Sequence, residues 1–66
     1  MLTIEDQARV VLIIAECKTI DEVAEYSNLI FDYVQELTTD QDVIASMYEF
    51  ISKIAFTKIK EFLINQ

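Results

Sequence analysis

The sequence contains no glycine, no proline and no histidine, and it has one cysteine among its 66 residues. Without glycine or proline, no helix interior is interrupted by either residue, and no glycine-rich phosphate loop exists. Without histidine, the commonest general base is missing, and a lone cysteine can form neither an internal disulfide nor a zinc site with histidine. We therefore expect no catalysis, no metal and no cofactor, and a fold that rests on apolar packing alone.

Basic residues are also scarce. Five lysines and arginines face twelve aspartates and glutamates, which gives a net charge of −7. Direct binding to nucleic acid or to an anionic membrane needs clustered basic residues, so the composition argues against both. The apolar run Val10–Ala15 is too short to span a bilayer, and the N-terminal segment lacks the basic start of a signal peptide. We expect a cytoplasmic protein whose charge suits a basic protein partner.

The apolar content is high for so short a chain. Hydrophobic residues make up 53% of the sequence, whereas typical globular chains contain roughly 45–50% even when glycine is counted. A small domain also has proportionally more surface to cover with polar groups. The excess indicates that some apolar surface is buried against another chain, in the simplest case a second copy.

Three segments open with threonine followed by acidic or amide residues, a pattern typical of helix N-termini: Thr3, Thr19 and Thr38–Thr39. The patterning predicts a single all-α domain with helices over about 4–17, 20–37 and 40–64. The predicted helices are joined by links of only two residues, 18–19 and 38–39, which favour an up-down-up three-helix bundle with a long C-terminal helix. We expect this bundle to pack as a homodimer.

The first predicted helix has only a narrow polar stripe, formed by Glu5, Arg9 and Glu16 when residues are placed at ~100° per position. Apolar side chains cover most of its remaining surface, which is far more than a helix of a monomeric three-helix bundle needs. Either this helix is wedged between its two neighbours, or it also lies in an oligomer interface. Ile13 falls beside the polar stripe and is a candidate for self-association.

The second predicted helix carries a stripe of carboxylates. It contains two like-charge pairs at i,i+4 spacing: Asp21 with Glu25, and Asp32 with Glu36. Each such pair weakens a helix by ~0.2–0.5 kcal/mol, and this helix has no basic residue to offset them. Leu29 sits among these acids. We interpret the five residues as a partner-binding surface, and an ordinary solvated face is the alternative.

The third predicted helix is long enough for its last turns to project past the first link if it is straight, and a bend is the alternative. Ile59, Phe62 and Leu63 would then lack cover from their own chain. Phe56 falls on the polar side of this helix. We assign these four residues, with Ile13, to self-association.

Five side chains have simpler interpretations. Cys17 is expected to be a buried apolar side chain, because no positive surroundings would activate its thiol. The tyrosines are expected to face the core with hydroxyls that reach its rim: Tyr26, Tyr33 and Tyr48. Lys58 points into the apolar half of its helix, where it either snorkels to solvent or pairs with an acid of a second subunit.

These features favour a small acidic regulator, an inhibitor or adaptor that docks on a larger, basic protein. The composition is compatible with a phage or bacterial accessory protein. One alternative is a decoy whose carboxylates replace DNA phosphates in a nucleic-acid-binding cleft, and its binding would weaken sharply with salt. Another alternative is a structural or assembly subunit that only packs with itself or with a larger complex.

Overall fold

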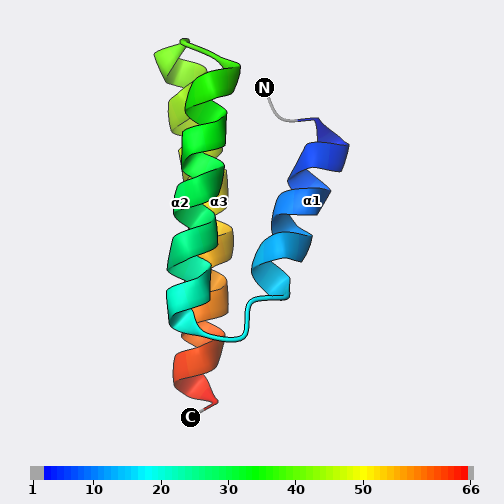
Figure 1. The fold of residues 1–66 in the computed structure, drawn as a ribbon, viewed down its shortest axis with the longest axis vertical. Helices are drawn as coiled ribbons and strands as arrows, with labels where there is room; N and C mark the ends of the chain where they lie inside the picture. The colour runs from blue at the N-terminus through cyan, green and yellow to red at the C-terminus, as the bar shows by residue number, and fades with distance from the viewer. Residues whose placement is uncertain (1–2, 66) are drawn as a thin grey trace.

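Three helices form the described part of the chain, which in this computed structural model covers residues 3–65. They are α1 (Ile4–Ala15), α2 (Ile20–Leu37) and α3 (Gln41–Ile64). The expected all-helical fold is confirmed, with no strand within residues 3–65. Figure 1 shows α2 and α3 running in opposite directions along the long axis, while α1 meets them near the α1–α2 link and diverges toward its own N-terminus. The direction of the chain alternates from helix to helix, as expected for an up-down-up bundle.

Threonine side chains begin α1 and α2, as predicted. Thr3 Oγ1 accepts a hydrogen bond from the amide of Asp6 at 3.1 Å, and the Asp6 carboxylate accepts one from the Thr3 amide at 3.4 Å. Thr19 Oγ1 accepts from the amide of Glu22 at 3.1 Å. The Glu22 carboxylate accepts from the amide of Lys18 rather than from that of Thr19. These bonds satisfy amides that the first turn of a helix leaves without a partner.

The cap of α3 differs from the prediction. Its N-cap is Asp40, whose Oδ1 accepts from the amides of Asp42 and Val43 at 3.0 and 3.3 Å. Thr38 Oγ1 accepts from the amide of Asp40 at 3.1 Å. An ionised carboxylate at the positive end of the helix dipole is a stronger acceptor than a hydroxyl, which explains why α3 begins at Gln41 behind an aspartate.

The first helix is two residues shorter than the predicted range 4–17. It ends at Ala15, and the amide of Cys17 donates to the carbonyl of Ile14 at 3.2 Å instead of continuing the helix. This turn carries the Cys17 side chain into the core, where it is 4% exposed. Burial of Cys17 therefore favours an early end of α1.

The core consists of two clusters of buried side chains to which all three helices contribute. The first core cluster contains Val10, Val34, Met47 and Ile51. The second contains Ile14, Cys17, Val23 and Ala55. The apolar half predicted for α3 is confirmed, because every one of its members is buried or half-buried: Val43, Ile44, Met47, Tyr48, Phe50, Ile51, Ile54, Ala55, Ile59 and Phe62.

α1 is not wedged between its neighbours. Within it only Val10 and Ile14 are buried. Its other large apolar side chains are exposed by 41–85%: Ile4, Val11, Leu12 and Ile13. Of the two alternatives raised by the sequence, the wedged helix is wrong, and most of the apolar surface of α1 is open to solvent.

Two of the three tyrosines also differ from the expectation. Tyr26 and Tyr33 are exposed by 43% and 55%. Tyr26 lies beside Ile13 and Cys17 at the α1–α2 junction, and Tyr33 follows two turns later on the same edge of α2. The core side of α2 at that level is instead occupied by Val34, which packs with Val10 of α1. Tyr48 packs as expected.

The end of α3 is better covered than predicted. Ile59 and Phe62 pack against the second core cluster of their own chain. Leu63 remains 59% exposed. The last turns of α3 extend past the α1–α2 link without a sharp bend (Figure 1), and Phe62 reaches back toward Thr19 and Ile20.

The molecule is elongated, with extents of 39 × 19 × 15 Å. α3 alone, with 24 residues, accounts for about 36 Å of that length at 1.5 Å per residue. The accessible surface of the chain is 4920 Å², whereas a monomeric protein of 7.7 kDa exposes roughly 4,300 Å². The chain thus exposes about 600 Å² more than its mass requires.

Candidate protein-binding surfaces

The predicted partner-binding residues share one side of α2, which we call the α2 outer face: Asp21, Glu25, Leu29, Asp32 and Glu36. All five are exposed, and Leu29 is exposed by 56%. The arrangement follows from helical spacing, because each carboxylate lies one turn from the next member of its pair. The structure therefore brings the predicted residues together on one accessible surface.

The charge of the α2 outer face is not balanced within the molecule. α2 contains no lysine or arginine. The ion pairs within residues 3–65 lie on α1, between Arg9 and both Glu5 and Asp6, and on α3, as Lys53–Glu49 and Lys58–Glu61. The face thus presents uncompensated negative charge around one exposed apolar side chain.

A second surface runs along α1. Four residues at successive spacings of four, three and four form what we call the α1 outer seam: Ile4, Ala8, Val11 and Ala15. This is the spacing of the apolar seam in a coiled coil. All four residues are exposed, although in a coiled coil the residues at such positions pack against a partner helix. Sequence reasoning missed this seam because it treated the apolar surface of α1 as one broad face; the spacing itself was the available signal.

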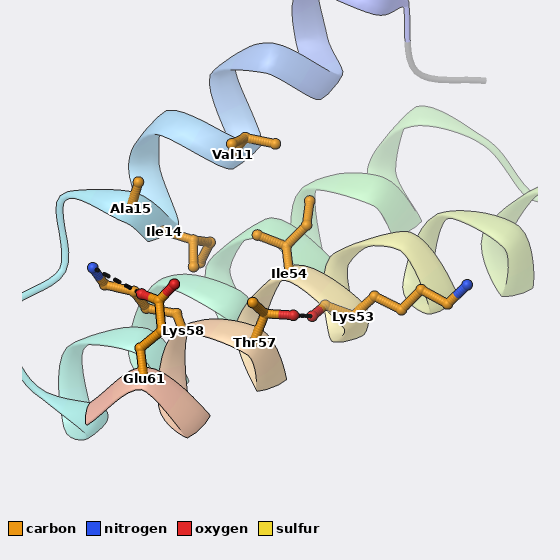
Figure 2. A pocket seen from close by; sticks show the side chains of 8 residues that line it. All are labelled: Val11, Ile14, Ala15, Lys53, Ile54, Thr57, Lys58 and Glu61. Atoms are coloured by element: carbon orange, nitrogen blue, oxygen red, sulfur yellow. Dashed lines mark hydrogen bonds and ion pairs between the residues drawn. The ribbon is translucent and has the colours of Figure 1, made fainter. Parts of the chain in front are cut away.

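A groove between α1 and α3 borders the α1 outer seam. It has a volume of about 340 Å³ and is lined mainly by Val11, Ile14 and Ala15 from α1 and by Ile54 and Thr57 from α3. In Figure 2, Ile14 points from α1 toward α3, and Ile54 points back toward α1. The Thr57 hydroxyl is satisfied within α3 as a donor to the carbonyl of Lys53, at 2.8 Å. The floor of the groove is therefore apolar.

The α3 wall of this groove also carries charge. Lys53 and Lys58 line it together with Glu61 (Figure 2). The Lys58 side chain is only 22% exposed, with its ammonium group 3.9 Å from Glu61 and 5.2 Å from the centre of the Phe62 ring. Lys58 thus lies along apolar surface and keeps its charged end at the rim, the snorkelling arrangement predicted for it.

The predicted self-association residues do not form one surface. Ile59 and Phe62 are half-buried in their own core. Phe56 and Leu63, exposed by 70% and 59%, share one edge of α3, about 200° around the helix from the groove residue Ile54. Ile13, exposed by 41%, lies on α1 beside Tyr26 of α2.

Cys17 is buried and free, as expected for a structural thiol. Its Sγ donates to the carbonyl of Ile13 at 3.4 Å. Burial raises the pKa of the Cys17 thiol, the Glu22 carboxylate raises it further, and Lys58 opposes the rise. A raised pKa lowers the thiolate fraction, so this site is poorly suited to nucleophilic or redox chemistry.

Ser27 is a core residue that the sequence analysis did not consider. It is 6% exposed, and its Oγ is buried without a hydrogen-bond partner in the described part of the chain. It lies one turn after Val23 and two turns before Val34, on the stripe of α2 that faces the core. The 3.6-residue period of this stripe was the signal that could have placed Ser27 inside.

Within residues 3–65, no group of three or more histidine, cysteine, aspartate or glutamate side chains is placed to hold a metal ion. No helix in the same range is both long and apolar enough to cross a membrane. Comparison with known proteins found no matching family model, no matching curated protein and no matching solved structure. The inference of function therefore depends on the surfaces described above.

Proposed function

We propose that this chain is a small non-enzymatic regulator, an inhibitor or adaptor that docks on a larger, basic protein and works as a homodimer. One observation carries the proposal: the exposed surface is divided between an acidic face on α2 and an apolar seam on α1. The two surfaces differ in chemistry, so they suit different occupants. The excess of about 600 Å² in accessible surface supports the view that at least one of them is covered in the working state.

The α2 outer face suits a different protein rather than a second copy. Two copies of the same acidic face would repel each other, whereas a basic surface would be attracted and steered toward it. Leu29 stands in the middle of the face, exposed by 56%, where an apolar pocket of the partner would exclude water from it. The proposed contact therefore combines long-range attraction with one apolar anchor.

Two charge-neutralised variants test this role. In the first, the four carboxylates of the α2 outer face are changed: Asp21→Asn, Glu25→Gln, Asp32→Asn and Glu36→Gln. In the matched control, four exposed acids of α1, its C-cap and α3 are changed: Glu5→Gln, Glu16→Gln, Glu49→Gln and Glu61→Gln. Each variant removes four negative charges from the net charge of −7. The control also breaks the exposed ion pairs of Glu5, Glu49 and Glu61, each of which contributes little to stability.

The measurement is a pull-down from a lysate of the source cells at low and high salt, with bound proteins identified by mass spectrometry. The α2 variant should lose a basic partner that the control retains, and Leu29→Ser should weaken the same contact at both salt concentrations. Circular dichroism verifies that each variant is folded. Equal retention of the partner by both charge variants would remove the α2 outer face from the proposal.

A DNA-mimicking decoy is a second candidate, favoured by the spread of the carboxylates along one side of α2. Asp21 and Glu36 are fifteen residues apart, which corresponds to about 22 Å along the helix. A decoy would capture a nucleic-acid-binding protein, and DNA would displace it. Its binding would fall steeply with salt and would be nearly indifferent to Leu29→Ser, which separates the decoy from the regulator.

A structural or assembly subunit is a third candidate, favoured by the exposed edge of α3 at Phe56 and Leu63. If assembly depends on this edge, Phe56→Asp should dissociate the particle. Light scattering measures the mass directly. An unchanged particle mass would show that assembly does not depend on this edge of α3.

A further inference from the structure

We infer that the groove between α1 and α3 is filled by α1 of a second copy, so that the two α1 helices pack antiparallel along their outer seams. This inference rests on the homodimer proposed above and specifies its interface. It concerns a different surface from the α2 outer face. The inference rests on the seam's spacing, its side-chain sizes and the exposed area.

The α1 outer seam is complementary to itself. In antiparallel pairing, Ile4 faces Ala15 of the second copy, and Ala8 faces its Val11. Each β-branched side chain is thereby opposed to an alanine, and facing large and small side chains interdigitate. A two-fold axis makes every contact occur twice, as an isologous interface requires.

The same geometry fills the groove. α1 forms one wall of the groove through Val11 and Ala15, and both residues also belong to the α1 outer seam. A helix placed against the seam therefore lies beside Ile54 of α3 as well. Since α1 and α3 run in the same direction, an antiparallel α1 from the second copy is antiparallel to both walls of the groove, which is the usual relation between neighbours in a helix bundle.

Side-chain size, rather than charge, distinguishes the antiparallel orientation from the parallel one. Lys58 and Lys53 line the groove, but each is already paired in its own chain, with Glu61 at 3.9 Å and Glu49 at 4.0 Å. Glu5 and Asp6 lie about 90° and 190° around α1 from the centre of the seam, so in either orientation they do not face these lysines. Parallel pairing would set Ile4 against Ile4 and Val11 against Val11, whereas antiparallel pairing sets each of them against an alanine.

The area is of the right size. A standard interface buries about 800 Å² per partner, and this chain exposes about 600 Å² more than a monomer of its mass. Burying the seam and the groove would reduce that excess. The α2 outer face would remain accessible on both copies, so the dimer would present two sites for the proposed partner.

The first test measures particle mass by sedimentation equilibrium. The wild-type chain should have twice its chain mass of 7.7 kDa, and Ala8→Glu should reduce this to the mass of one chain. Ala45→Glu is the matched control, because it adds the same charge at an exposed alanine of α3 about 180° around that helix from Ile54. The Ala45→Glu chain should remain dimeric.

Ile4→Ser supplies a second variant of the seam. Ile4 is 85% exposed in the single chain, so losing its side chain weakens only an interface.

The second test fixes the orientation. In a Cys17→Ala background, an equimolar mixture of Ala8→Cys and Val11→Cys chains should form an interchain disulfide, because residues 8 and 11 face each other in the antiparallel pair. Either chain alone should cross-link poorly. Equal cross-linking of the Ala8→Cys chain with itself would overturn the antiparallel seam.

The outcomes separate this inference from the proposed function. A dimer that survives Ala8→Glu and dissociates with Phe56→Asp overturns the seam and leaves the homodimer standing. A wild-type chain of single mass overturns both the seam and the homodimer, while partner binding by the α2 outer face is judged by its own variants. A monomeric Ala8→Glu chain that still captures the partner supports two independent surfaces.

Discussion

Phe31 of α2 and Tyr48 of α3 pack ring against ring, with centroids 4.6 Å apart and ring planes tilted by 55°. The side-chain amide of Gln35 donates a hydrogen bond to the Tyr48 hydroxyl. Both rings lie against the first core cluster. This contact joins α2 to α3 next to Val10, the residue that α1 contributes to that cluster.

Substitutions at Tyr48 should separate the ring contact from the hydrogen bond. Tyr48→Phe keeps the ring and loses one partly exposed hydrogen bond, so it should cost less than about 1 kcal/mol. Tyr48→Ala removes the ring and should cost about 2–3 kcal/mol, below the range for a fully buried aromatic because Tyr48 is half-buried. Urea denaturation measures both values. Tyr33→Ala, at a tyrosine exposed by 55%, is the control, and an equal loss there would contradict the role of the Phe31–Tyr48 contact.

The cap of α3 gives a second prediction. Asp40→Ala removes the acceptor for the amides of Asp42 and Val43 and should lower the free energy of unfolding by about 1 kcal/mol. For a domain of this size that corresponds to a fall in Tm of about 4–8 °C. Thr39→Ala should leave Tm nearly unchanged, because Thr39 is not the cap. A larger fall in Tm for Thr39→Ala than for Asp40→Ala would mean that the threonine, as predicted from the sequence, is the cap.

Much of the fold could be predicted because local signals agree with the tertiary packing at the starts of α1 and α2 and along α3. The caps at Thr3 and Thr19 and the apolar half of α3 are properties of short segments, and they are confirmed. The cap at Asp40 was missed because two threonines and an aspartate stand side by side at Thr38–Asp40. Choosing among them requires knowing where the chain turns, which depends on α2 and α3 packing together.

The placement of α1 could not be predicted from its own residues. Apolar side chains surround most of this helix, and the periodicity does not say which of them the chain's own core uses. The core takes Val10 and Ile14, which leaves the α1 outer seam exposed. The candidate surface on α2 was predictable for the opposite reason, because its charged and apolar sides are cleanly separated.

Removing the buried hydroxyl of Ser27 should stabilise the protein. Its Oγ has no hydrogen-bond partner in the described residues, and an unsatisfied buried polar group costs about 1–3 kcal/mol. Ser27→Ala relieves that cost and also favours the helix, so the free energy of unfolding should rise by about 1 kcal/mol. Thermal denaturation should register a higher Tm. Ser27→Val is the contrasting variant, because the extra volume of valine at a position that is only 6% exposed should lower the free energy of unfolding.

Cys17 should make the stability of the protein depend on pH in the alkaline range. Burial, aided by Glu22, raises the pKa of this thiol above its ordinary value of 9.0, so the folded state favours the neutral thiol. The resulting stabilisation is fully present below pH 9.0 and is lost as the pH rises through the higher pKa of the folded state, because the unfolded chain gains thiolate first.

Tyrosines and lysines titrate in the same range, so the measurement compares urea denaturation of the wild-type chain with that of Cys17→Ala at neutral and alkaline pH. The wild-type chain should lose more stability than Cys17→Ala on going to alkaline pH, and its thiol should react slowly with a disulfide reagent at neutral pH until denaturant is added. Parallel loss in both chains, together with rapid labelling of the folded protein, would contradict a buried, proton-retaining thiol at the junction of α1 and α2.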